Sequence, residues 1–203
     1  GLEILKGGSQ EAEAEFFSEI IALYTIALFV IYALIAVAFR SYSLPLLIMT
    51  AMPFGFMGAV FGHLIFNLPM ALFSYFGIGA AAGVVVNDNL VLIDYVRRLE
   101  REGMSPPKAL VTSAVSRFRP IFLTTVTTFV GLIPIMAEQS TSAQFLKPAV
   151  LSLAFGVFFA LFVSLLLVPA MYLVGYDWQQ MRLARKRRRT ASPGADEAAS
   201  VPV

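Results

Sequence analysis

Three adjacent polar residues, Asn87-Asp88-Asn89, interrupt the middle of an apolar stretch, residues 77–98, that is long enough to cross a bilayer. A second carboxylate, Asp94, follows in the same stretch. One charge at the bilayer centre costs about 2.5–3.5 kcal/mol by insertion scales, so an ionisable residue at that depth is a functional-site hypothesis by default. A carboxyl group held there could take up and release a proton, and the cluster therefore predicts a proton-handling site.

The spacing of these residues places them on different sides of a helix. Asn87 and Asp94 are seven residues apart and share a face, whereas Asp88 is turned by about 100° from Asn87. Asp94 should lie about 10 Å further along the axis, near the inner interface. Two interpretations stay open: the cluster handles protons, or it is interhelical hydrogen-bond glue. Asp94 could also be an interface carboxylate that pairs with Arg97 or Arg98.

The composition is that of a membrane protein. Of the 203 residues, 58% are hydrophobic and 14% are charged, against about a quarter charged in soluble proteins. The chain has no cysteine and a single histidine, His63, so we expect no disulfide frame, no metal site and no cofactor. We expect no nucleic-acid partner either, because no folded domain accompanies the basic run at residues 186–189.

The apolar runs predict an all-α membrane fold, a polytopic bundle of five transmembrane helices with one short amphipathic interfacial helix. The spans are expected at about residues 16–39, 44–66, 70–98, 120–137 and 148–174. The interfacial helix is expected at residues 105–118, capped by Ser105, because its apolar residues share one face and it is too short to span. Gly103 is a plausible C-terminal cap for the third span.

The flanking segments are polar. Residues 1–15 are expected to end a soluble region outside the membrane, and residues 175–203 to form a basic, disordered cytoplasmic tail. The chain starts with glycine and shows no signal peptide, so we expect a fragment of a longer chain.

The basic residues predict an orientation. With the N-terminus outside, thirteen of the 15 basic residues fall inside, and only Lys6 and Lys147 fall outside. Such an asymmetry indicates the cytoplasmic side. The inside set comprises Arg40, Arg97, Arg98, Arg101, Lys108, Arg117, Arg119, Arg182, Arg185, Lys186, Arg187, Arg188 and Arg189.

Small residues recur at the spacing that lets membrane helices approach closely. Gly58 and Gly62 form a GxxxG pair in the second span, and Gly79 and Gly83 form another in the third. We expect both pairs to be packing positions.

The segment GVVVNDNLVLIDYVRRLEREGMSPPKALVTSAVSRFRPIFLTTVTTFVGLIPI resembles the resistance-nodulation-division (RND) superfamily of efflux permeases, hydrophobe/amphiphile-exporter type. The likeness rests on G-x-V-V-N-[DN] in a spanning helix, the following L-x-[DE], the EGM(S) turn and R-F-R-P-I-x-x-T-T. It extends upstream and downstream over about 170 residues.

The resemblance implies the C-terminal part of a longer permease, whose spans here would be the family's eighth to twelfth helices. It implies a proton-driven exporter in the bacterial inner membrane that works as a homotrimer with a periplasmic adaptor and an outer-membrane channel. The remaining N-terminal half would be a partner within the same chain.

The resemblance also implies a set of proton-relay residues. Asn87 aligns with a buried polar position of the tenth helix that is lysine in the best-studied drug exporters, so Asp88 could carry the proton instead. Arg117 and Thr124 align with relay positions at the start of the eleventh helix. Asp94 completes the candidate set. The family's main proton-carrying aspartates lie in the fourth helix, which this chain does not contain.

Two other functions compete with transport. A scaffold or assembly subunit would need the polar cluster only for stability. An intramembrane aspartyl protease would need two converging carboxylates, but Asp88 and Asp94 point about 240° apart on one helix. We therefore expect a transporter and not an enzyme.

Overall fold

The structure is a computed structural model, and it describes the backbone of residues 2–191 and the side chains of residues 14–185. All regular elements among these residues are α-helices. Five helical segments are long and apolar enough to span a membrane, which confirms the predicted five-span all-α fold. These segments are Ala14–Phe39, Ser43–Phe66, Leu72–Arg101, Pro106–Ala137 and Thr141–Arg185.

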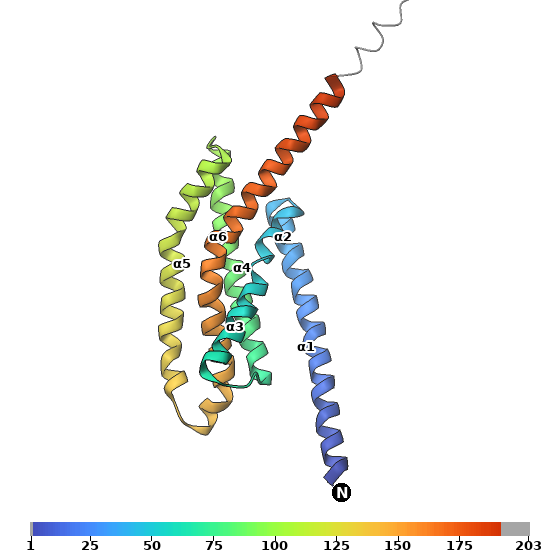
Figure 1. Cartoon of the computed structure of the whole chain (residues 1–203), viewed down its shortest axis with the longest axis vertical. Helices are drawn as coiled ribbons and strands as arrows, with labels where there is room; N and C mark the ends of the chain where they lie inside the picture. Colours follow the sequence, from blue (N-terminus) through green and yellow to red (C-terminus); the bar gives the residue numbers. More distant parts are fainter. Residues whose placement is uncertain (1, 192–203) are drawn as a thin grey trace, which may run out of the picture. The chain divides into compact units, whose positions relative to one another are not determined.

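The chain divides into two compact units, Gly1–Thr50 and Ala51–Val203. The first unit contains helix α1 (Leu2–Phe39) and helix α2 (Ser43–Met49) (Figure 1). Between the two helices, Arg40 has a left-handed backbone with φ of 50°. The hydroxyl of Tyr32 donates to the carbonyl oxygen of Tyr42 at 3.2 Å. Because α1 begins at Leu2, residues 2–15 are helical and continuous with the first span.

The predicted second span is broken into two helices. Helix α2 ends at Met49, and helix α3 (Met52–Phe66) starts anew with Pro53 in its first turn. Proline has no N–H to donate to the preceding turn and is well suited to a helix start. Residues Ser43–Phe66 still form one candidate membrane span, in agreement with the span expected at about residues 44–66, but Pro53 sets a helix boundary inside it.

The second unit consists of α3, α4 (Leu72–Arg101), α5 (Pro106–Ala137) and α6 (Thr141–Ala191). Helix α6 packs against each of the other three, and α4 also contacts α3 and α5. Figure 1 shows α6 running alongside α4 and α5. Helix α6 is therefore the element around which this unit is assembled.

The turn from α4 to α5 follows the sequence prediction. Gly103 has φ of 93° and its N–H donates to the Glu100 carbonyl at 3.0 Å, while the Met104 N–H donates to the Leu99 carbonyl at 3.0 Å. This bond pattern is a Schellman C-cap, which needs the left-handed conformation that glycine adopts without strain. Ser105 is the N-cap of α5, with Pro106 as the first helical residue.

The predicted interfacial helix and the fourth span are one helix. Helix α5 continues through Pro120, so the expected separate helix at residues 105–118 is wrong. Proline removes one backbone hydrogen bond, but in membrane helices neighbouring groups satisfy the freed carbonyl and the helix goes on. The amphipathic segment is therefore the first half of a rod 32 residues long.

Helix α6 extends beyond its predicted end. It contains 51 residues, about 76 Å of helix against a hydrocarbon core of about 30 Å. The disorder expected from residue 175 is therefore wrong up to Ala191, and residues 192–203 lie outside the described residues. A lack of apolar residues argues against a core but not against a helix, since Gln, Met, Arg, Leu, Ala and Lys all favour helix.

The predicted packing glycines behave differently in the two helices. A Cβ at Gly58 would lie 2.5 Å from the Phe155 carbonyl oxygen, and a Cβ at Gly62 would lie 2.7 Å from the Phe155 ring, so both permit the contact of α3 with α6. A Cβ at Gly83 would meet no described atom within 4 Å.

In α4 the close contact is made two residues earlier than the predicted pair, and so on another face. A Cβ at Gly77 would clash with the Ala149 carbonyl, and a Cβ at Gly156 would lie 2.9 Å from the Cβ of Ala81. Within the described chain Gly83 makes no close helix contact, and Gly79 is half-buried, so the role of this pair in packing stays a prediction.

Candidate functional site

The polar residues at the middle of α4 lie on opposite faces of the helix. Asn89 is only 1% exposed and belongs to the stripe through which α4 packs, which also contains Gly77, Ala81, Val85, Leu92 and Val96. Asn87 and Asp94 are exposed, and Asp88 is half-buried between the two faces. The shared face predicted for Asn87 and Asp94 is therefore the open face of α4.

The position of this open face within the membrane decides which kind of neighbour suits it. Residues 87 and 88 are within two residues of the midpoint of α4, a helix 30 residues long, so they lie near the bilayer centre when the helix spans it. An exposed amide at this depth is costly against lipid. The open face is therefore suited to a polar neighbour rather than to hydrocarbon.

Arg117 contacts an aromatic ring of α4. Its guanidinium carbon lies 5.1 Å from the centroid of the Tyr95 ring, within the range of a cation–π contact. Both side chains are half-buried. Arg98, one of the two partners considered for Asp94, instead forms a salt bridge with Glu102 at 3.2 Å. The structure therefore joins Arg117 to α4 next to Asp94, but through Tyr95.

Thr124 points away from the core of the unit. Its hydroxyl donates to the Pro120 carbonyl of its own helix at 2.9 Å, and the side chain is exposed. Thr125 is the buried neighbour, at 1% exposure. Among the side chains that the structure describes, no hydrogen bond or ion pair joins any two of Asn87, Asp88, Asp94, Arg117 and Thr124.

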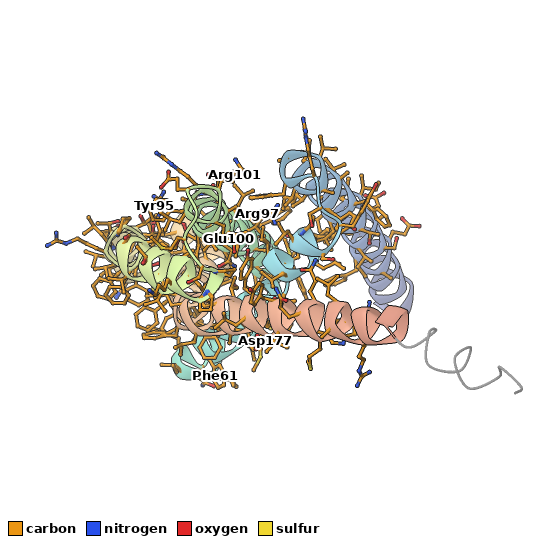
Figure 2. The ribbon with its side chains drawn as sticks, turned by 90° about the horizontal axis from the view of Figure 1, so that it is seen from above. Phe61, Tyr95, Arg97, Glu100, Arg101 and Asp177 are labelled. Atoms are coloured by element: carbon orange, nitrogen blue, oxygen red, sulfur yellow. The ribbon has the colours of Figure 1, made fainter. Side chains whose placement is uncertain are left out.

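A hydrogen bond between two side chains also links α4 to α6. The Tyr172 hydroxyl donates to Glu100 Oε1 at 2.8 Å. Figure 2 looks onto the end of the unit where α4 meets α5, and it labels Tyr95, Arg97, Glu100 and Arg101 on α4. Tyr95 and Tyr172 both pack on the apolar cluster of Val96, Leu99, Ala109 and Leu110. The aromatic residues of this end therefore combine apolar packing with polar contacts.

His63 ties together three segments at the other end of the unit. Its Nδ1 lies 3.1 Å from the Leu68 carbonyl oxygen, and its Nε2 lies 3.0 Å from Ser152 Oγ of α6. Since a carbonyl only accepts, Nδ1 carries the hydrogen and donates it. The buried ring thus joins α3, the α3–α4 turn and α6. It borders an open cavity of about 400 Å³ lined by Val60, His63, Leu64, Asn67, Leu68, Pro69 and Met70.

Sequence reasoning singled out Asn89 and His63 but missed the buried serines and Thr125 of the bundle. The buried polar residues that the structure describes are His63, Ser74, Asn89, Ser113, Thr125, Ser152 and Ser164. For the burial of Asn89 a signal was available, because Gly77, Ala81, Val85 and Asn89 recur every four residues and mark one helix face. The glycine and alanine at the head of this series are the residues that permit close approach.

Comparison with known proteins agrees with this architecture. Residues 1–175 match the family model described as the AcrB/AcrD/AcrF family. The multidrug resistance protein MdtC of Proteus mirabilis (strain HI4320) is 28% identical over 188 residues, which cover 88% of this chain and 18% of that protein. MdtC of Shigella flexneri is 26% identical over 190 residues, with 91% of this chain and 18% of that protein covered. The chain thus spans about a fifth of the length of these relatives.

Solved structures share the fold. The crystal structure of a heavy metal efflux pump (crystal form II) superposes with a TM-score of 0.73, covering 81% of this chain and 16% of that one at 22% identity. Crystal form I gives a TM-score of 0.69 at the same identity. With the family model covering residues 1–175, this chain belongs to the AcrB/AcrD/AcrF family of RND permeases.

Proposed function

We propose that the chain is the C-terminal membrane portion of a proton-driven RND exporter, and that the open face of α4 couples proton movement to transport. The observation that carries this proposal is that α4 has two unlike faces. Asn89 is buried in the bundle, whereas Asn87, near the middle of the helix, and Asp94, closer to its C-terminus, are exposed. Polar side chains at that depth need polar neighbours. The chain covers about a fifth of its relatives, so these neighbours can come from the rest of a longer permease.

The proposed relay has Asp88 as the proton-carrying group and Asn87 as its neutral neighbour on the open face. Asp88 is half-buried beside that face, so it can exchange a proton with a group placed there. Thr124 and Arg117 lie seven residues apart on α5 and therefore share a helix face. Thr124 adds a hydroxyl, and Arg117 a fixed positive charge, to the path toward the cytoplasm.

In this proposal the chain is a multi-pass protein of the bacterial inner membrane with a periplasmic N-terminus and a cytoplasmic C-terminus. The thirteen-to-two distribution of basic residues supports this orientation. The substrates are small hydrophobic or amphiphilic molecules, in keeping with relatives named as multidrug resistance proteins. The family resemblance adds a homotrimer, a periplasmic adaptor and an outer-membrane channel, and we propose transport and not enzymatic catalysis.

The test places the chain in a full-length permease and measures efflux of a fluorescent amphiphile at matched membrane abundance. We expect Asp88→Asn and Asn87→Ala to lower efflux strongly, and Thr124→Val to lower it without lowering abundance. Thr112→Val is the matched control, because Thr112 is an exposed threonine in the first turns of the same helix. Undiminished efflux of both Asp88→Asn and Asn87→Ala would sink the coupling proposal.

The orientation has its own test. A cysteine at position 8 should react with an impermeant reagent added outside, and a cysteine at position 108 only with reagent inside. The chain has no native cysteine to confuse the labelling. Labelling of both positions from one side would refute the five-span topology with this orientation.

A further inference from the structure

The side chain of Arg117 is of a kind that is ordinarily mobile near a membrane interface. Arg117 is the twelfth of the 32 residues of α5, three residues before Pro120. Long basic side chains near a membrane interface commonly extend along the helix to reach water. Such a side chain has many rotamers, so its charge has no defined place unless a neighbour holds it.

Tyr95 is that neighbour, and it is itself held in place. The ring packs on the cluster of Val96, Leu99, Ala109 and Leu110, which contains residues of both α4 and α5. The guanidinium carbon of Arg117 lies 5.1 Å from the ring centroid. The ring is thus fixed by apolar packing on one side and presents a surface for the cation on the other.

The position of Tyr95 in α4 gives the contact its consequence. Tyr95 directly follows Asp94, and in Figure 2 it is labelled at the same end of α4 as Arg97 and Glu100. Holding Arg117 there keeps its charge at the part of α4 that carries Asp94, one residue before the ring.

We propose that Tyr95 is a positioning residue that holds the Arg117 guanidinium against α4 through its aromatic ring. This inference rests on the proposed function, in which Arg117 serves the relay. The ring is the active feature, and the phenol hydroxyl is dispensable.

The experiment measures efflux rates against substrate concentration in a full-length permease that carries this chain, at matched abundance. Tyr95→Leu should lower the maximal rate by about 2- to 30-fold, the factor given by the usual strength of a cation–π contact. The substrate concentration at half-maximal rate should not change. Tyr95→Phe keeps the ring and should stay within about twofold of the parent. In an Arg117→Leu background, Tyr95→Leu should cause no further loss.

Tyr172→Leu is the matched control for lost packing, because Tyr172 packs on the same apolar cluster but belongs to α6. It should retain the maximal rate. If Tyr95→Phe is as poor as Tyr95→Leu, or if Tyr172→Leu is equally poor, the positioning role is wrong. Loss of efflux in Arg117→Leu with full efflux in Tyr95→Leu would overturn this inference alone. Full efflux in Arg117→Leu would overturn the proposed relay role of Arg117 and this inference with it.

Discussion

Gly58 and Gly83 offer a matched test of the helix packing, since both are glycines inside spanning helices. A Cβ at Gly58 would lie 2.5 Å from the Phe155 carbonyl oxygen and 2.5 Å from Phe159 Cβ. Both atoms belong to α6 at or next to its backbone, so neither can rotate away. A Cβ at Gly83 meets no described atom within 4 Å. The same change to alanine therefore overpacks one site and fills open space at the other.

The expected magnitude comes from two opposing terms. Replacing glycine by alanine inside a helix stabilises by about 0.5–1 kcal/mol, and this gain applies at both sites. Overpacking a tight contact costs about 1–3 kcal/mol, and this cost applies only at Gly58. Because the helix term cancels in the comparison, Gly58→Ala should be less stable than Gly83→Ala by about 1–3 kcal/mol.

The assay is unfolding of the purified chain in mixed micelles by added denaturing detergent, followed by loss of helical circular dichroism. Membrane abundance of each variant gives a second reading, which also covers a Gly58→Ala protein that fails to accumulate. Equal stability and equal abundance of Gly58→Ala and Gly83→Ala would refute the close approach of α3 to α6.

Three further predictions concern polar contacts. His63→Ala and Ser152→Ala should each lower the stability of the bundle. A double-mutant cycle of the two changes should give a coupling energy of about 0.5–1.5 kcal/mol, which is typical of one hydrogen bond. Additive effects of the two changes would mean that this hydrogen bond is not formed. Tyr172→Phe removes the donor to Glu100 Oε1 and should lower the free energy of unfolding by about 0.5–1.5 kcal/mol. If Glu100 is the partner, this loss should vanish in a Glu100→Ala background, where the acceptor oxygen is gone. Arg98→Ala breaks an ion pair whose side chains are 70% and 57% exposed, so its effect should stay below about 0.5 kcal/mol and fade with salt; a larger loss would show that Arg98 has another role.

The number of spans and the end of α4 could be predicted from the sequence. Long apolar runs bounded by charged turns have few alternative structures. Gly103 also has a local signature, because it follows a helix that ends in basic residues and precedes a capping serine and a proline.

The continuity of helices was harder to predict, because it depends on whether a proline interrupts a helix. Pro53 opens a new helix, whereas Pro120, Pro134, Pro148 and Pro169 lie inside continuing ones. A proline tolerated within a helix needs its freed carbonyl satisfied by neighbours, and neighbours are not visible in a local pattern. The prediction missed the helix beyond residue 175 because it considered only whether the residues could form an apolar core, and not their helix propensity.

The residue types of the site could be predicted from the sequence, but the face of α4 that packs against the bundle could not. Periodicity placed Asn87 and Asp94 together, and both are exposed. Which face packs, however, was inferred from Gly79 and Gly83, and the structure uses Gly77 and Ala81 instead. The Tyr95–Arg117 contact joins residues 22 positions apart across a turn, a pairing that no single-helix pattern contains.

Helix α4 has one face buried in the bundle and one exposed face, and the two faces should tolerate substitution differently. Changes at Asn89 must preserve the fit of the bundle, since this side chain is buried in the packed face of α4. Changes at Asn87 or Asp94 leave that fit intact, because both side chains are exposed. A substitution at position 87 can therefore alter the ionic chemistry of the exposed face without disturbing the packing of α3, α4, α5 and α6 described above.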